Sequence, residues 1–401
     1  MKRILLGILC MSSIFLTACW DAVELSDIGI VVMVGFDIDD DGLDRVTILS
    51  IQPFGRGGEE EETSRTWIGT ASGRSAYEAM RNLRRISTRT LDFSHNNIIV
   101  IGEDKAKQGM SNINDIISRS RELRYDTSIF ITTGRADEFM QIPATLELSL
   151  FREVIGMIEN TREWSKGFAL EVKDFALNSM AAHQYGFVIG NIGFYNVDRA
   201  TFSTSRQDLM KMFWKDSQKS IAYISGSAVI YRNRLVGWLS PEELRGYLMI
   251  SNQMEEGVTF INTDSGYEAT INITEIRSEI SFSALSEEKI TAQVKVKATG
   301  VLTELTGVAY DYGISLIETL EEETAKYLAS EMALTMDRAQ NQLRTDFIGF
   351  HRLFNIKYPK EWKELGDNWS EVFCRIPVSY DVEFKIQREG LLRTNIGGEG
   401  N

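Results

Sequence analysis

The chain is poor in cysteine, and this limits the covalent chemistry available to it. Of its three cysteines, Cys10 and Cys19 lie near the N-terminus and only Cys374 lies in the body of the chain. An intramolecular disulfide is therefore not expected once the N-terminal segment is removed. The apolar neighbours of Cys374 favour a core cysteine over a reactive thiol.

Motifs for metal binding and catalysis are missing as well. The three histidines, His95, His183 and His351, stand far apart in the sequence, whereas a zinc site needs clustered ligands. The sequence contains no Gly-x-Ser-x-Gly, no P-loop and no Gly-x-Gly-x-x-Gly. We therefore predict no metal, no cofactor, no catalytic residue and no enzymatic activity.

Basic residues are outnumbered. There are 43 lysines and arginines against 57 aspartates and glutamates, and the formal net charge is −14 at pH 7. This balance disfavours nucleic acid as a partner and a polybasic patch as a membrane anchor. Four arginines nonetheless share one predicted helix: Arg81, Arg84, Arg85 and Arg89. A solvated helix face explains them, and contact with an acidic partner loop or with lipid headgroups is the alternative.

The chain also lacks an apolar run long enough to span a membrane, which takes about 20 residues. Residues 4–15 are apolar, two basic residues precede them, and Leu16-Thr17-Ala18-Cys19 ends the segment. This arrangement predicts a bacterial lipoprotein signal cleaved between Ala18 and Cys19. The Cys19 sulfur would carry diacylglycerol and its amino group an acyl chain such as palmitate, enough for stable anchoring at the outer face of a membrane. An ordinary secretory signal with an incidental cysteine is the alternative.

Length and composition indicate a globular protein of several domains. Its 401 residues are 43% hydrophobic and 10% aromatic, which is enough for two or three cores. We predict an α+β protein of about three domains. The predicted segments are a signal peptide at 1–18, a mixed α/β N-terminal domain at 19–190, a small middle domain with a β-hairpin and a helix at 191–255, an α+β C-terminal domain at 256–392, and a disordered tail at 393–401.

Local patterns support the first two domains. Residues 28–36 are a nearly unbroken apolar, β-branched run, which is typical of a strand buried on both faces. Helical spacing appears over 75–87. In the middle domain, two short strands within 228–239 flank a turn, and Ser240-Pro241-Glu242-Glu243 predicts a capped helix start.

The C-terminal region alternates polar and apolar residues over 290–302 and 378–387. This period of two predicts strands of an antiparallel sheet with one buried and one solvated face. Between them, apolar residues from Leu328 to Phe350 recur at spacings of four and three. That spacing predicts one long helix, starting near Ile314, packed on the sheet.

One acidic motif imitates a metal site. Asp37, Asp39, Asp41 and Gly42 copy the start of a calcium-binding EF-hand loop. Ile48, however, stands where that loop needs a bidentate glutamate, and the flanks are strand-like. We therefore predict a tight hairpin turn.

Several motifs, taken in order, resemble those of the Ger(x)C family, the lipoprotein C subunits of nutrient germinant receptors in spore-forming bacteria. The resemblance is carried by Cys19-Trp20-Asp21, Gly35-Phe36-Asp37, Gly226 to Tyr231, Asp346-Phe347-Ile348-Gly349-Phe350, Tyr358-Pro359-Lys360-Glu361-Trp362 and Trp369. We call the following the signature residues and expect structural roles for them: Trp20, Asp21, Gly226, Asp346, Gly349, Pro359, Trp362 and Trp369. A binding role for the two late tryptophans is the alternative to burial.

The resemblance implies a non-catalytic, lipid-anchored subunit at the outer face of the inner spore membrane, required for germination in response to small nutrients. Its implied partners are an A-type subunit with large soluble parts and a B-type, transporter-like subunit. A solute-binding lipoprotein of a transporter is the alternative, but such proteins usually carry two similar α/β lobes. A surface hydrolase is disfavoured because no nucleophile with its base is evident.

Overall fold

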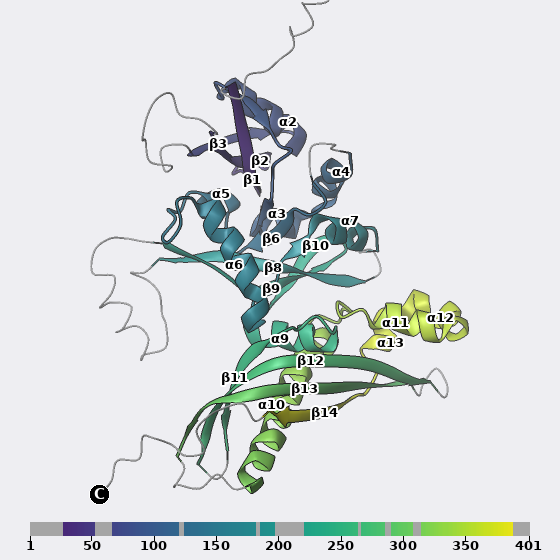
Figure 1. Cartoon of the computed structure of the whole chain (residues 1–401). Helices are drawn as coiled ribbons and strands as arrows, with labels where there is room; N and C mark the ends of the chain where they lie inside the picture. Colours follow the sequence, from purple (N-terminus) through teal and green to yellow (C-terminus); the bar gives the residue numbers. More distant parts are fainter. Residues whose placement is uncertain are drawn as a thin grey trace, which may run out of the picture.

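The protein is elongated and built around two β-sheets that lie at opposite ends of the molecule (Figure 1). The computed structural model describes residues 27–52, 66–119, 124–181, 185–196, 220–263, 266–284, 290–307 and 314–387. Both sheets are packed against helices. The predicted α+β, multidomain class is therefore confirmed.

The first sheet has ten strands. Its main order is β10-β9-β8-β6-β5-β1-β2-β3, while β4 pairs with β1 and β7 with β6. The central pairs β1–β5, β5–β6 and β6–β8 are parallel. The strands are β1 (Ile28–Ile38), β2 (Asp44–Ile51), β3 (Thr66–Gly73), β4 (Thr90–Asp92), β5 (Ile98–Gly102), β6 (Ser128–Thr132), β7 (Leu170–Glu171), β8 (Gly186–Asn196), β9 (Ser220–Tyr231) and β10 (Arg234–Leu239).

Helices cover both faces of this sheet because its central strands are apolar on both sides. Val34 and Phe36 of β1 pack in one cluster with α2, α4 and α7. Val32 and Met33 pack in another cluster with α5 and α6. The expected burial of β1 on both faces is thus confirmed. The helices are α2 (Ala76–Asn82), α3 (Glu103–Gln108), α4 (Ser111–Arg119), α5 (Ala136–Met140), α6 (Leu150–Trp164) and α7 (Val172–Ala181).

The predicted hairpin and capped helix follow this sheet. Strands β9 and β10 are joined by Arg232 and Asn233, whose φ angles of 52° and 57° are the left-handed values of a type I′ turn. Helix α9 (Pro241–Ile250) then begins with a complete capping box at Ser240. Strands β8, β9 and β10 all pair within the first sheet, and β8 runs through residue 190. The domain boundaries at 190 and 255 stay predictions.

The second sheet has four strands in the order β11-β12-β13-β14. They are β11 (Gly257–Asn262), β12 (Glu268–Ala284), β13 (Ile290–Thr306) and β14 (Val378–Ile386). Strand β14 runs parallel to β13, so the expectation of a wholly antiparallel sheet was wrong for this strand. A long helical crossover joins β13 to β14 and returns the chain to the same end of the sheet. Alternation of polar and apolar residues is the same for either strand direction, so it could not show this.

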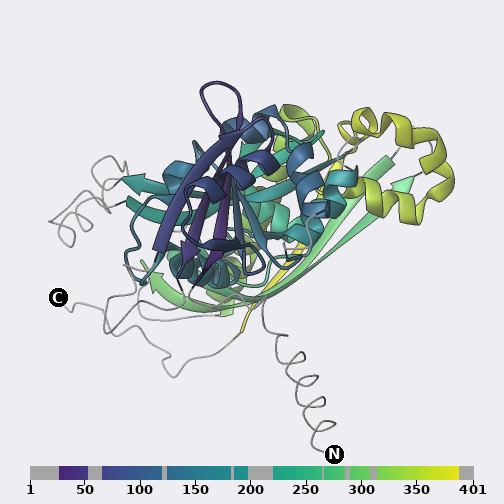
Figure 2. The same ribbon diagram turned by 90° about the horizontal axis from the view of Figure 1, so that it is seen from above.

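The long helix begins where predicted but ends earlier. Helix α10 (Ile314–Asp337) continues only through a π-helical turn at 338–342. Met332 and Met336 pack on the second sheet, whereas Phe347 lies in the following turn. Three short helices follow and project to one side of the first sheet (Figure 2). They are α11 (Phe350–Lys357), α12 (Pro359–Leu365) and α13 (Trp369–Phe373).

A buried ion pair joins α9 to α10 and to the second sheet. Gly246 lets the helices approach, because a Cβ there would lie 2.3 Å from the Glu331 carbonyl oxygen. Beside it, the 1% exposed Arg245 donates Nε–H and Nη2–H to the two carboxylate oxygens of Glu331, each at 2.7 Å. Arg245 also donates to the Val258 carbonyl oxygen at 2.8 Å and to Thr259 Oγ1 at 3.3 Å. One arginine therefore fastens two helices to the edge strand β11.

Candidate coupling site between the two sheets

Signature residues near the C-terminus gather around one buried carboxylate, that of Asp346, which is 3% exposed. Its Oδ1 accepts hydrogen bonds from the backbone N–H groups of Gly349 at 2.9 Å and Phe350 at 3.1 Å. Its Oδ2 accepts from the His351 backbone N–H at 2.7 Å and from the Trp369 indole N–H at 2.9 Å. Asp346 therefore caps the free amides at the start of α11 and fastens α13 to them.

The His351 ring adds a further donor. Its Nδ1 lies 3.0 Å from Asp346 Oδ2, and because an ionised carboxylate only accepts, Nδ1 carries the proton. Burial raises the pKa of Asp346, but the hydrogen bonds and charge of His351, with the Trp369 indole, outweigh burial and hold that pKa below its usual range. The carboxylate is thus kept ionised in the protein interior.

The turn that contains Asp346, just before α11, also contacts the first sheet. The backbone N–H of Gly186, the first residue of β8, donates to the Asp346 carbonyl oxygen at 3.1 Å. The preceding Tyr185 stacks on the His351 ring with centroids 3.6 Å apart and an interplanar angle of 4°. A Cβ at Gly186 would lie 2.5 Å from the Thr345 side chain. The start of β8 and the start of α11 therefore pack directly on each other.

The two late tryptophans pack beside the turn that contains Asp346. Trp369 is 2% exposed, and its ring centroid lies 5.1 Å from that of Trp362 and 5.1 Å from that of Phe354. Pro359 is the first residue of α12, the helix that carries Trp362. The structure thus brings Asp346, Gly349, Trp362 and Trp369 together as one packed unit.

Gly226 lies apart from this unit, in β9. Its φ angle is +71°, in the region that favours glycine. A Cβ there would lie 2.5 Å from the Leu239 carbonyl oxygen of the neighbouring β10. Both the backbone angle and the neighbouring strand therefore require glycine at this position.

We expect Gly226→Ala to lower the free energy of unfolding by about 2–3 kcal/mol, from left-handed strain plus displacement of β10. Gly42→Ala is the matched control, because Gly42 also has a positive φ, +79°, but nothing within 4 Å of its Cβ position. That variant should lose only about 1 kcal/mol. Urea unfolding of both variants measures the difference, and equal losses would show that the Leu239 contact costs nothing.

A second buried carboxylate fixes the end of β1. Asp37 is 3% exposed and accepts hydrogen bonds from the backbone N–H groups of Ala136 at 2.8 Å and Asp137 at 2.9 Å. These amides open α5. Burial raises the pKa of Asp37 to about 6, although the two amide donors act in the opposite direction.

The raised pKa predicts a pH dependence with a definite sign. The folded protein holds the Asp37 proton more tightly than the unfolded chain, whose pKa is near 3.8, so stability falls as the pH rises from about 4 to about 6. A difference of about 2 pKa units corresponds to about 3 kcal/mol. Urea unfolding of the wild type and of Asp37→Asn across this window should show a further loss in the wild type that the variant lacks, because the other carboxylates titrate in both proteins. Parallel pH profiles would contradict the assignment.

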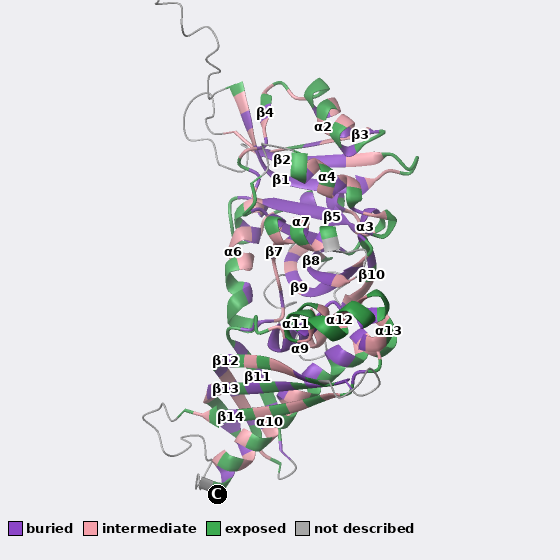
Figure 3. Ribbon diagram, turned by 90° about the vertical axis from the view of Figure 1, so that its right-hand side faces the viewer, coloured by how far each residue is buried: buried purple, intermediate pink, exposed green. Residues whose placement is uncertain are grey.

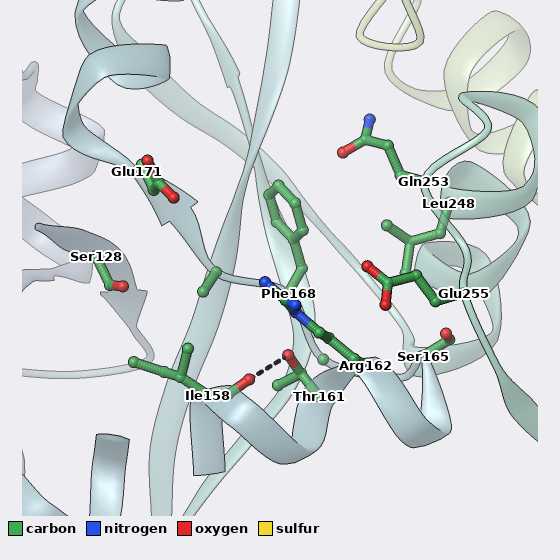
Figure 4. Close-up of a pocket in the computed structure, with 12 residues that line it drawn as sticks. Ser128, Ile158, Thr161, Arg162, Ser165, Phe168, Glu171, Leu248, Gln253 and Glu255 are labelled. Carbon is green, nitrogen blue, oxygen red and sulfur yellow. Dashed lines mark hydrogen bonds between the residues drawn. The ribbon is translucent and has the colours of Figure 1, made fainter. Parts of the chain in front are cut away.

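A cavity of about 340 Å³ lies beside the end of α6, between the first sheet and the segment that runs from α9 towards β11. Figure 4 shows Phe168 in its middle, with Arg162, Glu171 and Glu255 among the side chains around it. Arg162 and Glu255 are exposed, and Glu171 already pairs with Lys173. This mixed, solvated lining favours no single class of ligand.

The remaining predicted features have separate outcomes. Ala18, Cys19, Trp20 and Asp21 lie outside the described residues, so the lipoprotein signal and the roles of these residues stay predictions. The hairpin turn is confirmed, since the Asp39 carboxylate accepts hydrogen bonds from the N–H groups of Asp41 and Leu43. Cys374 packs against the core, and burial raises the pKa of its thiol.

In the part of the chain that the structure describes, no helix is both long and apolar enough for a membrane span. The same ranges contain no group of three or more His, Cys, Asp or Glu residues that could bind a metal.

Two family descriptions match the chain in sequence order. Residues 21–192 match the "Spore germination protein N-terminal domain" and residues 225–390 match "Spore germination B3/ GerAC like, C-terminal". The chain belongs to the Ger(x)C family. The resemblance inferred from its motifs is therefore confirmed.

Relatives of this Ger(x)C protein in Bacillus subtilis (strain 168) are spore germination proteins. Spore germination protein KC is 25% identical, over 97% of this chain and 96% of the relative. Spore germination protein A3 is 21% identical, over 97% and 99%, and spore germination protein B3 is 20% identical, over 92% and 94%. The solved structure titled "Crystal Structure of the GerBC protein" matches with a TM-score of 0.56 and 20% identity, over 92% of this chain and 100% of that chain. That likeness confirms the fold.

Sequence reasoning missed two members of this Ger(x)C coupling site. Tyr185 carries no periodic signal, because it stands alone before β8. His351 was weighed as a metal ligand and not paired with Asp346, although its position five residues after Asp346 could have indicated a carboxylate–imidazole pair.

Proposed function

We propose that this Ger(x)C protein is the lipid-anchored, non-catalytic C subunit of a spore nutrient germinant receptor. The single observation that carries the proposal is its end-to-end similarity to spore germination proteins, with both family regions in order. In this proposal it sits at the outer face of the inner spore membrane and assembles with an A-type and a B-type, transporter-like subunit. It is required for the response to nutrients.

The coupling site supports a mechanical role. A subunit that transmits a signal between partners needs a fixed relation between its parts, and the turn at Asp346 contacts both the first sheet and the helices that pack on the second. The buried ion pair of Arg245 and Glu331 stiffens the adjoining helices. The residues that form these contacts are capping and packing groups. Their chemistry suits a scaffold.

Purification of the tagged protein from detergent-solubilised spore membranes tests the proposal. An A-type and a transporter-like B-type subunit should co-purify. Recovery of an ABC permease instead would favour the solute-binding alternative, and recovery of no membrane protein would contradict the receptor assignment.

Anchoring is tested separately with Cys19→Ala, which removes the sulfur that would accept the lipid. The variant should leave the membrane fraction, because without acyl chains it loses the main source of membrane affinity. Western blots of membrane and soluble fractions measure this, and Cys374→Ala is the control that should stay membrane-bound. Full retention of the Cys19 variant would contradict a lipid anchor.

A further inference from the structure

A small cavity of about 110 Å³ lies where β1 begins. Gly29, Ser50, Trp67, Ile86 and Arg89 are among the residues that line it. Gly29 leaves the space open, since a Cβ there would come within 2.9 Å of Ser50 Oγ. The volume is sufficient for one phosphate-sized group.

Arg89, which lines this cavity, carries an unsatisfied cationic donor. Arg89 Nη1 is buried and has no hydrogen-bond partner within the described structure. A buried charged donor without an acceptor is costly, and such a group normally marks a missing ligand or ion. Ser50, which is 2% exposed, lines the same cavity. A planar guanidinium next to a hydroxyl is suited to phosphate oxygens.

The turn that leads into this cavity combines positive charge with an exposed apolar side chain. Arg84 and Arg85 are exposed and make no ion pair with any residue in the described ranges. Ile86, which lines the cavity, is 55% exposed. Leu83, fully buried, holds this turn on the sheet. Two free arginines beside a protruding isoleucine are the combination that binds at the interface of an anionic bilayer.

The position of the cavity indicates which phosphate it would meet. Gly29 lies ten residues after Cys19, and the first described residue, Asp27, only eight. Eight residues reach at most about 29 Å, so a lipid on Cys19 would hold this end of the protein at the bilayer. Figure 3 shows β4 and α2 at the same end of the molecule as the start of β1.

We propose that the Arg89 cavity, with Arg84 and Arg85 in the turn that leads into it, binds the phosphate of an anionic phospholipid headgroup and docks the first sheet on the membrane beside the lipid anchor. The inference rests on the lipid anchoring proposed above. It adds a second contact, which would fix the orientation of the subunit on the bilayer.

Hydrogen–deuterium exchange of the mature, lipidated protein on vesicles tests this docking. Vesicles of phosphatidylcholine alone are compared with an equal mixture of phosphatidylcholine and phosphatidylglycerol. Exchange of the amides in 84–91 should slow about tenfold or more on the anionic vesicles. The slowing should disappear in Arg89→Gln and in the surface variant Arg84→Gln/Arg85→Gln. The matched control, Lys360→Gln/Lys363→Gln on the exposed face of α12, should keep it.

Three results would overturn the proposal. Equal exchange on both vesicles would show that anionic lipid does not bind here. Slowing on neutral vesicles when inorganic phosphate is added, with no further effect of anionic lipid, would assign the cavity to free phosphate. Protection on neutral vesicles that is lost when Glu59 to Glu62 are changed to glutamine would show that the chain's own acidic segment fills the site. Flotation of the wild type with neutral vesicles reports the lipid anchor alone, so failure of the anchor is distinguished from failure of the cavity.

Discussion

Replacing Asp346 with asparagine should lower the free energy of unfolding by about 3–5 kcal/mol. The side chain keeps its size, but one of its two oxygens becomes a donor. Two backbone N–H groups converge on Oδ1, and two N–H groups and the His351 Nδ1 converge on Oδ2. Whichever way the amide is turned, its NH₂ group faces at least two buried donors, and their hydrogen bonds are lost without replacement.

Urea unfolding followed by tryptophan fluorescence is the direct measurement, because Trp369 donates to this carboxylate and Trp362 packs beside it. Asp367→Asn is the matched control. Asp367 lies between α12 and α13 but is exposed, so this variant should lose no more than about 0.5 kcal/mol of stability. A loss below about 1 kcal/mol at Asp346 would contradict the role given to its carboxylate. In spores, Asp346→Asn should reduce germination in response to nutrients if the coupling site transmits the signal as proposed.

Glu331→Gln should cost about 3–5 kcal/mol as well, for a different reason. The substitution leaves the Arg245 guanidinium, 1% exposed, without a compensating charge in the protein interior. Burial raises the pKa of Glu331 above its usual range, although the charge and hydrogen bonds of Arg245 act in the opposite direction. Thermal or urea unfolding measures the loss.

A double variant distinguishes the value of the pair from the cost of breaking it. Arg245→Met/Glu331→Leu should recover much of the stability lost in Glu331→Gln, because apolar side chains of similar volume often replace a buried ion pair with little loss. The exposed pair of Arg375 and Glu371, 3.8 Å apart, supplies the control, and Glu371→Gln should cost less than about 1 kcal/mol. A double variant less stable than Glu331→Gln would show that the Val258 and Thr259 contacts of Arg245 dominate.

Local patterns predicted those parts of the fold that neighbouring residues control. The β-branched run at 28–36 indicated a strand buried on both faces, and Ser240 with Pro241 indicated the start of α9. Both signals depend only on residues that are close in the sequence. The type I′ turn at Arg232 and Asn233 is local in the same way. Motif order alone also indicated the family.

Local patterns could not show contacts between distant segments. Alternation of polar residues in β14 is the same whether the strand lies parallel or antiparallel to β13, so the crossover decided its direction. Apolar residues continued to recur at spacings of four and three past Asp337, because Phe347 and Phe350 also face the core. These two residues nevertheless lie beyond the end of α10.

The sequence by itself determined the family and the α+β class, and it predicts lipid attachment at Cys19 and structural roles for the signature residues near the C-terminus. Only the tertiary structure decided what those residues do. The role of Asp346 depends on five donors from a helix start, an imidazole and an indole, and on a contact with Tyr185 and Gly186 far away in the sequence. Burial and hydrogen bonding of a charge are set by groups that the fold brings together from distant positions, and no local pattern encodes them.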